Sequence, residues 1–487
     1  MFGSALPCEH AVADQAFAHA LGKGDEHLPD PVGAGSAFPP PVGHNVSHLE
    51  PPRSGGSGEG ISEEITNSLS RLPNLQVMAR STVSHYKSRQ DDPQGVGHDL
   101  HVDAVVTGRV VEHGSELNVE TELVDVANGA QLWGERYSRS SDEAPLLQLA
   151  ITRDVATHVR PALSNAEKET VAKVGTRDDE AYRLYLKGRF HVARYTEEDW
   201  KMATSFFEQA INRDSGYAEA YAAAGETYAM RSYVGYIPAP NGIEKSLAAA
   251  RRAVQLDENS AESHVSMALA DFVSWNFPET QSELQKALAL GPGVAFAHEL
   301  SAWFNVTEGR VNDAIAESEK AVELDPLSLF YNAEYAVLYL YARAPKTAIK
   351  EADKLAEIDP NTPRAFRIKA EAYEQLRDYK EAVVCWMKSQ TMEGHEDRAN
   401  GLKQAFKKFG YTGFLKKQAE YREADHNYIG AAFDYAKLGD EDATFDALEK
   451  AFENRSGILY IKSEPDFDSV RSDPRFADLL RRIGLPQ

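Results

Sequence analysis

Apolar residues follow two different spacings along this chain. Near residue 61 they recur every three or four positions, which predicts a helix, and between residues 103 and 137 they alternate with polar residues, which predicts strands. The expected elements are a helix over 61–72, a strand over 75–79, a helix near 94–100, strands over 103–112, 117–126 and 130–137, and a helix over 146–163. Asn128-Gly129, between the last two strands, is a strong hairpin signal. This order indicates a small antiparallel or mixed sheet with helices on one face.

Beyond residue 177 the helical spacing acquires a period of 34 residues. Pro292, Pro326 and Pro360 each end one unit and lie 34 residues apart. Alanines recur where the two helices of a unit should touch, at Ala268, Ala302, Ala336 and Ala370 on the first helix and at Ala314, Ala348 and Ala382 on the second. This period and this pattern are those of the tetratricopeptide repeat, a pair of antiparallel helices. We therefore expect about six repeats over 177–394, with a longer loop over 231–242 inside the second.

The two ends of the chain differ from these regular parts. Residues 1–60 hold eight of the 23 prolines and ten of the 33 glycines, so we expect a disordered leader over 1–58. Over 395–487 we expect helices, a degenerate repeat near 431–451 and a tail that caps the solenoid. The predicted fold is thus a small α+β sheet domain over 59–170, followed by an all-α tetratricopeptide-repeat solenoid.

Composition narrows the classes of protein that this chain can belong to. Its 487 residues include 52 Lys and Arg against 75 Asp and Glu, a formal net charge of −23. Such a charge argues against nucleic acid as the default partner and against a membrane surface held by charge. Two cysteines cannot form a disulfide framework. Because no spanning helix or signal peptide is recognisable, we expect a cytoplasmic protein without a membrane span.

The search for catalytic and cofactor-binding motifs finds no pattern that fits. Cys8 and the histidines at 10, 19, 27, 44 and 48 have irregular spacing that matches no zinc site. The glycines at 55, 56, 58 and 60 are not followed by the Lys-Ser/Thr pair of a phosphate loop. The basic stretch over 401–422 is interpreted as the polar face of a packed helix, the alternative being a nucleic-acid or membrane site. We expect no enzyme activity, no cofactor and no metal.

Four segments of the first domain resemble a known family. They are Gly60–Ile65, Leu75–Ser81, Thr107–Val110 and Gln131–Glu135, and in this order they are similar to the TolB-like (FlgO-like) domain. That domain precedes tetratricopeptide repeats in many bacterial signalling proteins, and the resemblance covers roughly residues 59–165. The family opens with an apolar strand, but residues 46–52 do not read as one. We therefore expect the sheet to lack its first strand and to leave an exposed edge.

The resemblance to tetratricopeptide proteins implies a binding groove, because the first helix of each repeat lines the concave face in that family. The corresponding residues here are Phe272, Phe296, Trp303, Phe330, Val337, Tyr341, Arg364, Arg367 and Glu371. They form a stripe that is aromatic in the middle and charged at one end, which favours an apolar or aromatic peptide segment or a neighbouring domain. The alternative is that these side chains pack against the chain's own 231–242 loop or its C-terminal tail.

Two functions remain open at this point. The first is a non-enzymatic scaffold or adaptor that binds protein partners in the groove. The second is the sensory or regulatory half of a bacterial signalling protein, since in the resembled family this module often follows a Ser/Thr kinase, a nucleotide cyclase or a winged-helix DNA-binding domain. On the second interpretation the start of this chain is not the natural one. A membrane span upstream would then place the chain outside the cytoplasm.

Overall fold

The structure is a computed structural model that divides into two compact units. It describes the backbone of residues 13–22, and residues 65–66, 69–70, 72, 75–79, 82–83, 86, 92–113, 116–140, 143–159, 164, 175–192, 194, 196–455 and 457–485. Among these, the first unit extends to residue 186 and the second begins at residue 187. The division therefore falls inside helix α6 (Asp179–Val192).

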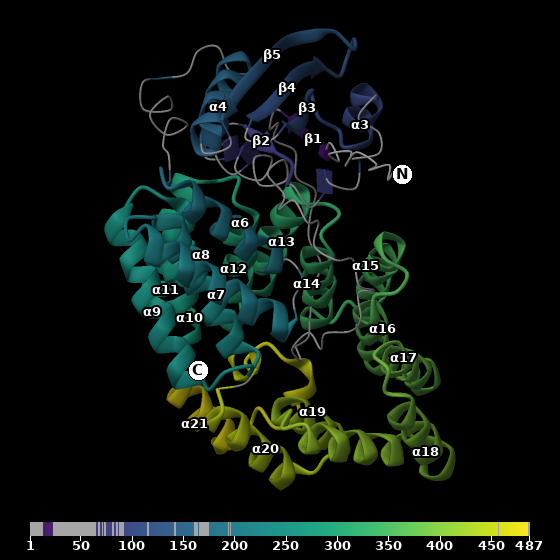
Figure 1. Cartoon of the computed structure of the whole chain (residues 1–487). Coiled ribbons are helices and arrows are strands. Elements are labelled where there is room, and N and C mark those ends of the chain that lie inside the picture. The colour runs from purple at the N-terminus through teal and green to yellow at the C-terminus, as the bar shows by residue number, and fades with distance from the viewer. Residues whose placement is uncertain are drawn as a thin grey trace, which may run out of the picture. The chain divides into compact units, whose positions relative to one another are not determined.

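The first unit is a five-stranded antiparallel sheet with helices (Figure 1). Its strands are β1 (Ala13–Gly22), β2 (Gln76–Val77), β3 (Ala104–His113), β4 (Glu116–Asp125) and β5 (Gln131–Ser140), in the order β2-β1-β3-β4-β5. Its helices are α3 (Pro93–Asp99) and α4 (Ala144–Val159). All neighbouring strands pair antiparallel. Short hairpins connect β3 to β4 and β4 to β5, whereas β1 pairs with β2 and β3 across long stretches of sequence.

Successive side chains along the strands point to opposite faces of this sheet, and apolar residues pack on both faces. Val106, Val119 and Leu123 point to one face and pack against α4. On the opposite face, Val105 packs with residues of α3. The turn between β4 and β5 contains Gly129 with a φ of +70°, which explains the Asn-Gly hairpin signal.

Strand β1 corrects two expectations. Residues 13–22 lie within the leader that was expected to be disordered, yet they pair with β3 from Ala13 opposite Glu112 to Leu21 opposite Ala104. The edge of β3 that was expected to be exposed is therefore covered, because β1 satisfies its backbone hydrogen-bonding groups. The rest of 1–58, including Cys8 and the glycines at 55–58, lies outside the described residues, as do parts of the helix expected over 61–72.

The second unit contains a tetratricopeptide-repeat solenoid (Figure 1). Six helix pairs follow one another: α6 with α7 (Glu197–Arg213), α8 (Ala218–Tyr233) with α9 (Ala239–Leu256), α10 (Ala261–Val273) with α11 (Phe277–Leu290), α12 (Ala295–Thr307) with α13 (Val311–Leu324), α14 (Leu329–Tyr341) with α15 (Pro345–Ile358), and α16 (Pro363–Gln375) with α17 (Tyr379–Met392). The seven periodic alanines are all fully buried, because helices that approach this closely leave no space for larger side chains. The loop between α8 and α9 is shorter than the expected 231–242, since both helices extend into that stretch.

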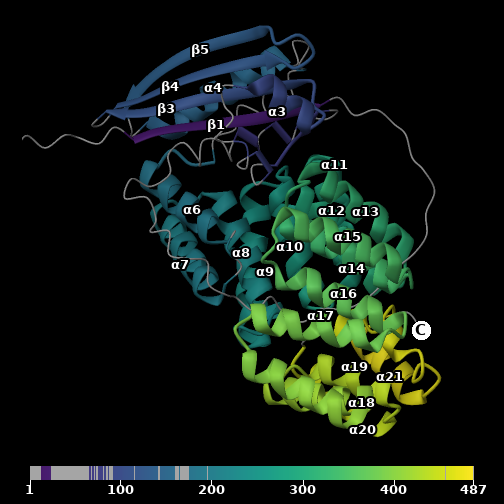
Figure 2. The same cartoon turned by 90° about the vertical axis from the view of Figure 1, so that its right-hand side faces the viewer.

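The C-terminal helices turn back toward the earlier repeats. They are α18 (Glu396–Ala424), α19 (Tyr428–Leu438), α20 (Glu441–Glu453) and α21 (Pro474–Ile483), with the short 3₁₀ helices η3 (Ile458–Tyr460) and η4 (Pro465–Phe467) between the last two. Figures 1 and 2 both show α18–α21 running beneath the repeat helices. Arg455, just after α20, donates to the carbonyl of Ser274 at the end of α10 (3.2 Å). The second unit therefore closes on itself within the concave side of its repeats.

Membrane-spanning helices and metal-binding clusters were both sought among the residues that the structure describes. No helix among them is both long and apolar enough to cross a membrane. The same part of the chain contains no group of three or more His, Cys, Asp or Glu side chains arranged to hold a metal ion.

Candidate partner-binding groove

The predicted groove residues come from the first helices of four consecutive repeats. Phe272 lies on α10, Phe296 and Trp303 on α12, Phe330, Val337 and Tyr341 on α14, and Arg364, Arg367 and Glu371 on α16. The structure brings the aromatic ones together, since the Trp303 ring centroid lies 6.0 Å from that of Phe296 and 5.9 Å from that of Phe330. Both contacts are edge-to-face, the arrangement that aromatic quadrupoles favour.

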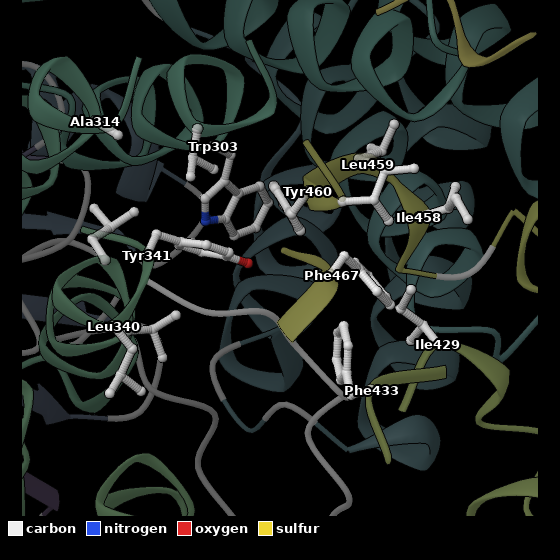
Figure 3. Packing of buried hydrophobic residues seen from close by; sticks show 14 of the residues in the cluster. Trp303, Ala314, Leu340, Tyr341, Ile429, Phe433, Ile458, Leu459, Tyr460 and Phe467 are labelled. Carbon is white, nitrogen blue, oxygen red and sulfur yellow. The ribbon is translucent and has the colours of Figure 1, made fainter. Parts of the chain in front are cut away.

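The groove is occupied by a segment of the same chain, residues 457–468, which we call the strap. Figure 3 shows Trp303 and Tyr341 pointing toward Tyr460 of the strap, with Ile458, Leu459 and Phe467 in the same cluster. The ring centroids of Tyr341 and Tyr460 lie 6.2 Å apart. Two polar contacts tie the strap to the repeats: Ser463 in its middle donates to the carbonyl of Val306, and Asp468 at its end pairs with Arg343.

Occupation by the strap buries much of the predicted binding stripe. Phe272, Trp303, Val337 and Tyr341 are at most 3 % exposed, so they cannot touch a partner in this conformation. Phe296 and Phe330 are partly exposed, and the ring of Tyr233, at the end of α8, stacks on Trp303 at 6.1 Å. Of the two arrangements considered from the sequence, packing against the chain's own tail is the one present here.

The charged end of the stripe is largely paired within the chain. Arg364 donates to Glu334 at 3.0 Å, and Arg367 lies 3.3 Å from Glu393. Glu371 is partly buried, and this burial raises its pKa to about 7 against the lowering effect of Lys437 and Arg364. These contacts connect α16 to its neighbours and leave little charge available for a ligand.

One carboxyl group on the concave side has no cationic partner in an ion pair with a described residue. Glu299 of α12 is fully buried and accepts a hydrogen bond from the Ser318 hydroxyl (2.9 Å). Burial, and then the charge of Glu334, raise its pKa well above the ordinary value. Lys437 is also buried, but it lies between Glu374 (2.6 Å) and Asp466 (2.8 Å) and is thereby paired.

The sequence reasoning missed a ladder of polar residues that recurs with the repeat. His264 and His298 each contact a backbone carbonyl through Nε2 at 2.9 Å, and Asn332 donates to the equivalent carbonyl of Pro326 at 3.0 Å. On the paired helix, each repeat has a Glu–Lys ion pair, at Glu283–Lys286, Glu317–Lys320 and Glu351–Lys354. All these positions are 34 residues apart, so a search for polar residues at the period of the prolines would have found them.

Comparisons with known proteins give partial similarities. No protein-family model matches the chain. It is 27 % identical over 226 residues to the putative adenylate cyclase 3 of Rhizobium meliloti, covering 46 % of this chain and 38 % of that protein. It is 22 % identical over 229 residues to the transcriptional regulator HilA of Salmonella typhimurium, covering 47 % and 40 %. The chain thus spans about two fifths of the length of these curated relatives.

Among solved structures, TTC0263, a tetratricopeptide-repeat protein of Thermus thermophilus, is similar with a TM-score of 0.32 at 17 % identity, over 40 % of this chain and 96 % of that one.

Proposed function

We propose that this chain is a non-enzymatic protein-interaction scaffold whose concave groove binds an apolar segment of a partner protein. The observation that supports this proposal is the strap itself. A segment that consists largely of the two short 3₁₀ helices η3 and η4 fits the concave face, with Ile458, Tyr460 and Phe467 fully buried. A partner segment of the same chemistry would take the place of the strap and contact Trp303 and Phe330.

A partner segment must displace the strap to enter the groove, and the free energy lost with the strap's contacts limits which partners can bind. Burial of one large apolar side chain stabilises by about 1.5–3 kcal/mol, and the strap buries several such side chains. A competing segment must therefore present a comparable apolar surface, and a weak or largely polar peptide would not displace the strap. This requirement favours partners whose binding segment carries several large aliphatic and aromatic side chains.

A peptide-binding experiment with strap variants tests the proposal. A fluorescein-labelled peptide of residues 457–468 should bind a chain weakened by Ile458→Ser with Tyr460→Ser and should bind wild type much less. Addition of Trp303→Ala and Phe330→Ala to the weakened chain should abolish binding, whereas addition of the matched Leu132→Ala, a change at an exposed position on β5, should not. If the weakened chain remains folded and does not bind the peptide, the groove is not a binding site.

A second candidate function is favoured by the sequence matches to longer regulatory proteins. We infer that the first unit is a TolB-like domain and that the chain is the sensory half of a bacterial signalling protein, an adenylate cyclase, a Ser/Thr kinase or a transcription regulator. Strand β1 supports this inference, because the resembled family opens with a strand. Affinity purification from the native host tests it: co-purification of such an effector domain, or its presence in the same reading frame, is the expected result.

A further inference from the structure

Helix α18 contains a basic stretch that contrasts with the rest of this acidic chain. Residues 401–417 include five lysines and no acidic residue, although the chain as a whole carries a net charge of −23. Lys403, Lys407, Lys408 and Lys416 are exposed, and none of the four forms an ion pair with any residue that the structure describes. In Figures 1 and 2, α18 lies at the lower edge of the second unit, beside α17 and α19. The stretch therefore presents unpaired positive charge to solvent.

An exposed aromatic side chain lies in the middle of these lysines. The Phe409 side chain is 63 % exposed, more than any other large hydrophobic residue that the structure describes. The Lys408 ammonium lies 4.7 Å from the centroid of its ring. An isolated exposed apolar residue is ordinary, but this one is held in place by the local backbone.

Two glycines determine the position of Phe409. Gly410 has a φ of +64° and a ψ of −159°, a combination that is essentially restricted to glycine, and it divides α18 into two helical parts. At Gly413, an added Cβ atom would lie 2.4 Å from the Cβ of Phe409, so a larger residue there would push the phenyl ring away. At this kink the Phe409 ring therefore faces solvent beside Lys408.

The apolar surface continues from the kink to the start of α17. The ring of Tyr411 stacks on Tyr379 with their centroids 4.1 Å apart, and Tyr379 is itself exposed. On the inner side, Tyr411 stacks on the fully buried Phe414. The aromatic residues of the kink are therefore anchored in the core of the C-terminal helices, and a ligand would meet a rigid surface.

We propose that the surface formed by Lys403, Lys407, Lys408, Phe409 and Lys416, the α18 patch, binds an acidic polypeptide segment that carries an aromatic or aliphatic anchor. Charge complementarity identifies this partner: lysines without internal ion pairs attract carboxylates, and the exposed ring supplies the apolar contact that binding hot spots commonly need. The inference extends the proposed scaffold function to a second surface. It does not depend on the groove, because none of the groove residues lies on α18.

Fluorescence anisotropy with a labelled peptide of repeated Asp-Glu-Phe-Leu units tests the α18 patch on the full chain. Wild type should bind this peptide, and it should not bind the Asn-Gln-Phe-Leu analogue, which has no charge. Lys407→Gln with Lys408→Gln should weaken binding about tenfold, and Phe409→Ala by a similar factor. Both changes are at exposed positions, so circular dichroism should show unaltered thermal unfolding.

Matched controls separate this surface from general charge effects and from the groove. Lys346→Gln with Lys350→Gln, two exposed lysines of α15, should leave the affinity unchanged, and so should Trp303→Ala with Phe330→Ala. Absence of binding to the acidic peptide would overturn the proposal. An equal loss of affinity in the variant with Lys346→Gln and Lys350→Gln would also overturn it. Tighter binding to phosphatidylserine vesicles or to single-stranded DNA, abolished by the same Lys407 and Lys408 changes, would replace the protein partner with a lipid or nucleic acid.

Discussion

At the scale of single residues, the ladder of His264, His298 and Asn332 explains how successive repeats keep the same geometry. Each side chain bonds a backbone carbonyl six residues earlier, at the turn that precedes its helix. The two histidines also contact a glutamate of the paired helix, at 2.7 Å for His298 and Glu317. In these two repeats one buried histidine thus joins the turn and both helices, and an apolar replacement would leave the turn carbonyl unsatisfied.

This geometry predicts a difference between two substitutions of His298. His298→Ala should lower the free energy of unfolding by about 1–3 kcal/mol, because it removes the partner of the Pro292 carbonyl and of one Glu317 carboxylate oxygen, the other oxygen remaining paired with Lys320. His298→Asn should cost less, since Asn332 fills the same position in the next repeat. Urea unfolding of the second unit measures both. Equal losses for the two variants would show that the hydrogen bond to the turn contributes nothing.

The buried carboxyl of Glu299 predicts a pH dependence of stability. Its pKa is raised in the folded chain, so above the ordinary value near 4.5 the folded state holds a proton that the unfolded state has released. Stability then falls as the pH rises, by up to about 1.4 kcal/mol per pH unit until the folded pKa is reached. Glu299→Gln, which keeps the acceptor for Ser318, should stabilise the chain at pH 7 and lose this advantage toward pH 4.

A matched variant makes the measurement specific. Glu357→Gln changes an exposed glutamate on α15, and the difference in unfolding free energy between this variant and wild type should not change with pH. Because other buried carboxyls also titrate, the informative quantity is the difference between wild type and variant at each pH. A constant difference for Glu299→Gln between pH 5 and pH 8 would contradict the prediction.

The sequence predicted the burial of side chains that recur with the repeat. It did not predict contacts between residues that lie far apart along the chain. The periodic alanines are buried as expected, because the helix contact inside a repeat depends only on local spacing. For Trp303 and Tyr341 the resemblance to tetratricopeptide proteins predicted a place on the concave face, and here both side chains pack with Tyr460 in one buried cluster. What covers that face depends on Tyr460, more than a hundred residues away, and no local pattern carries that information.

At the scale of elements, α18 illustrates how one residue divides a helix. The helix extends over 29 residues, yet the backbone at Gly410 is non-helical. The sequence indicated one or two helices over 401–422 and could not decide between them, because a glycine within a helical pattern signals either a tolerated residue or a break. The strands were predicted well where alternation was strong, whereas β1 was missed within a stretch rich in Pro and Gly.

The kink predicts a graded response to alanine substitution. Gly410→Ala should destabilise by about 1–3 kcal/mol, since its backbone conformation is one that alanine avoids. Gly394→Ala provides the comparison: it has a φ of +78° and, like Gly410, no atom within 4 Å of an added Cβ. A left-handed turn residue of this kind costs an alanine roughly 1 kcal/mol. Thermal unfolding of both variants measures the two losses of stability. Equal decreases in melting temperature would mean that the backbone conformation of Gly410 costs alanine no more than an ordinary left-handed turn does.

At the scale of the whole second unit, the strap converts an open array of repeats into a closed one. Repeat solenoids ordinarily have contacts only between neighbours and can unfold from their ends. Here Ser463 bonds Val306, 157 residues earlier, and Arg455 bonds Ser274, 181 residues earlier. These contacts couple α10–α14 to the C-terminal helices, so we expect the described part of this unit to unfold together.

Removal of the strap's central ring tests this coupling. Tyr460→Ala should destabilise the second unit by about 3–5 kcal/mol and should raise hydrogen exchange in α12 and α14 as well as in α19. Tyr460→Phe keeps the ring and should have a small effect. If exchange rises only within residues 457–468, the strap is a local cover and the repeats are stable without it.

The strap follows Trp303 and Tyr341 by more than a hundred residues in the sequence, and this order has a consequence for synthesis on the ribosome. Helices α10–α16 emerge and can pair within their repeats long before residues 457–485 are translated. During that interval Trp303 and Tyr341 face solvent with nothing of their own chain to cover them. Nascent chains of this protein should therefore expose an aromatic surface that chaperones recognise, and that surface disappears once residues 457–468 have left the exit tunnel and packed against the repeats.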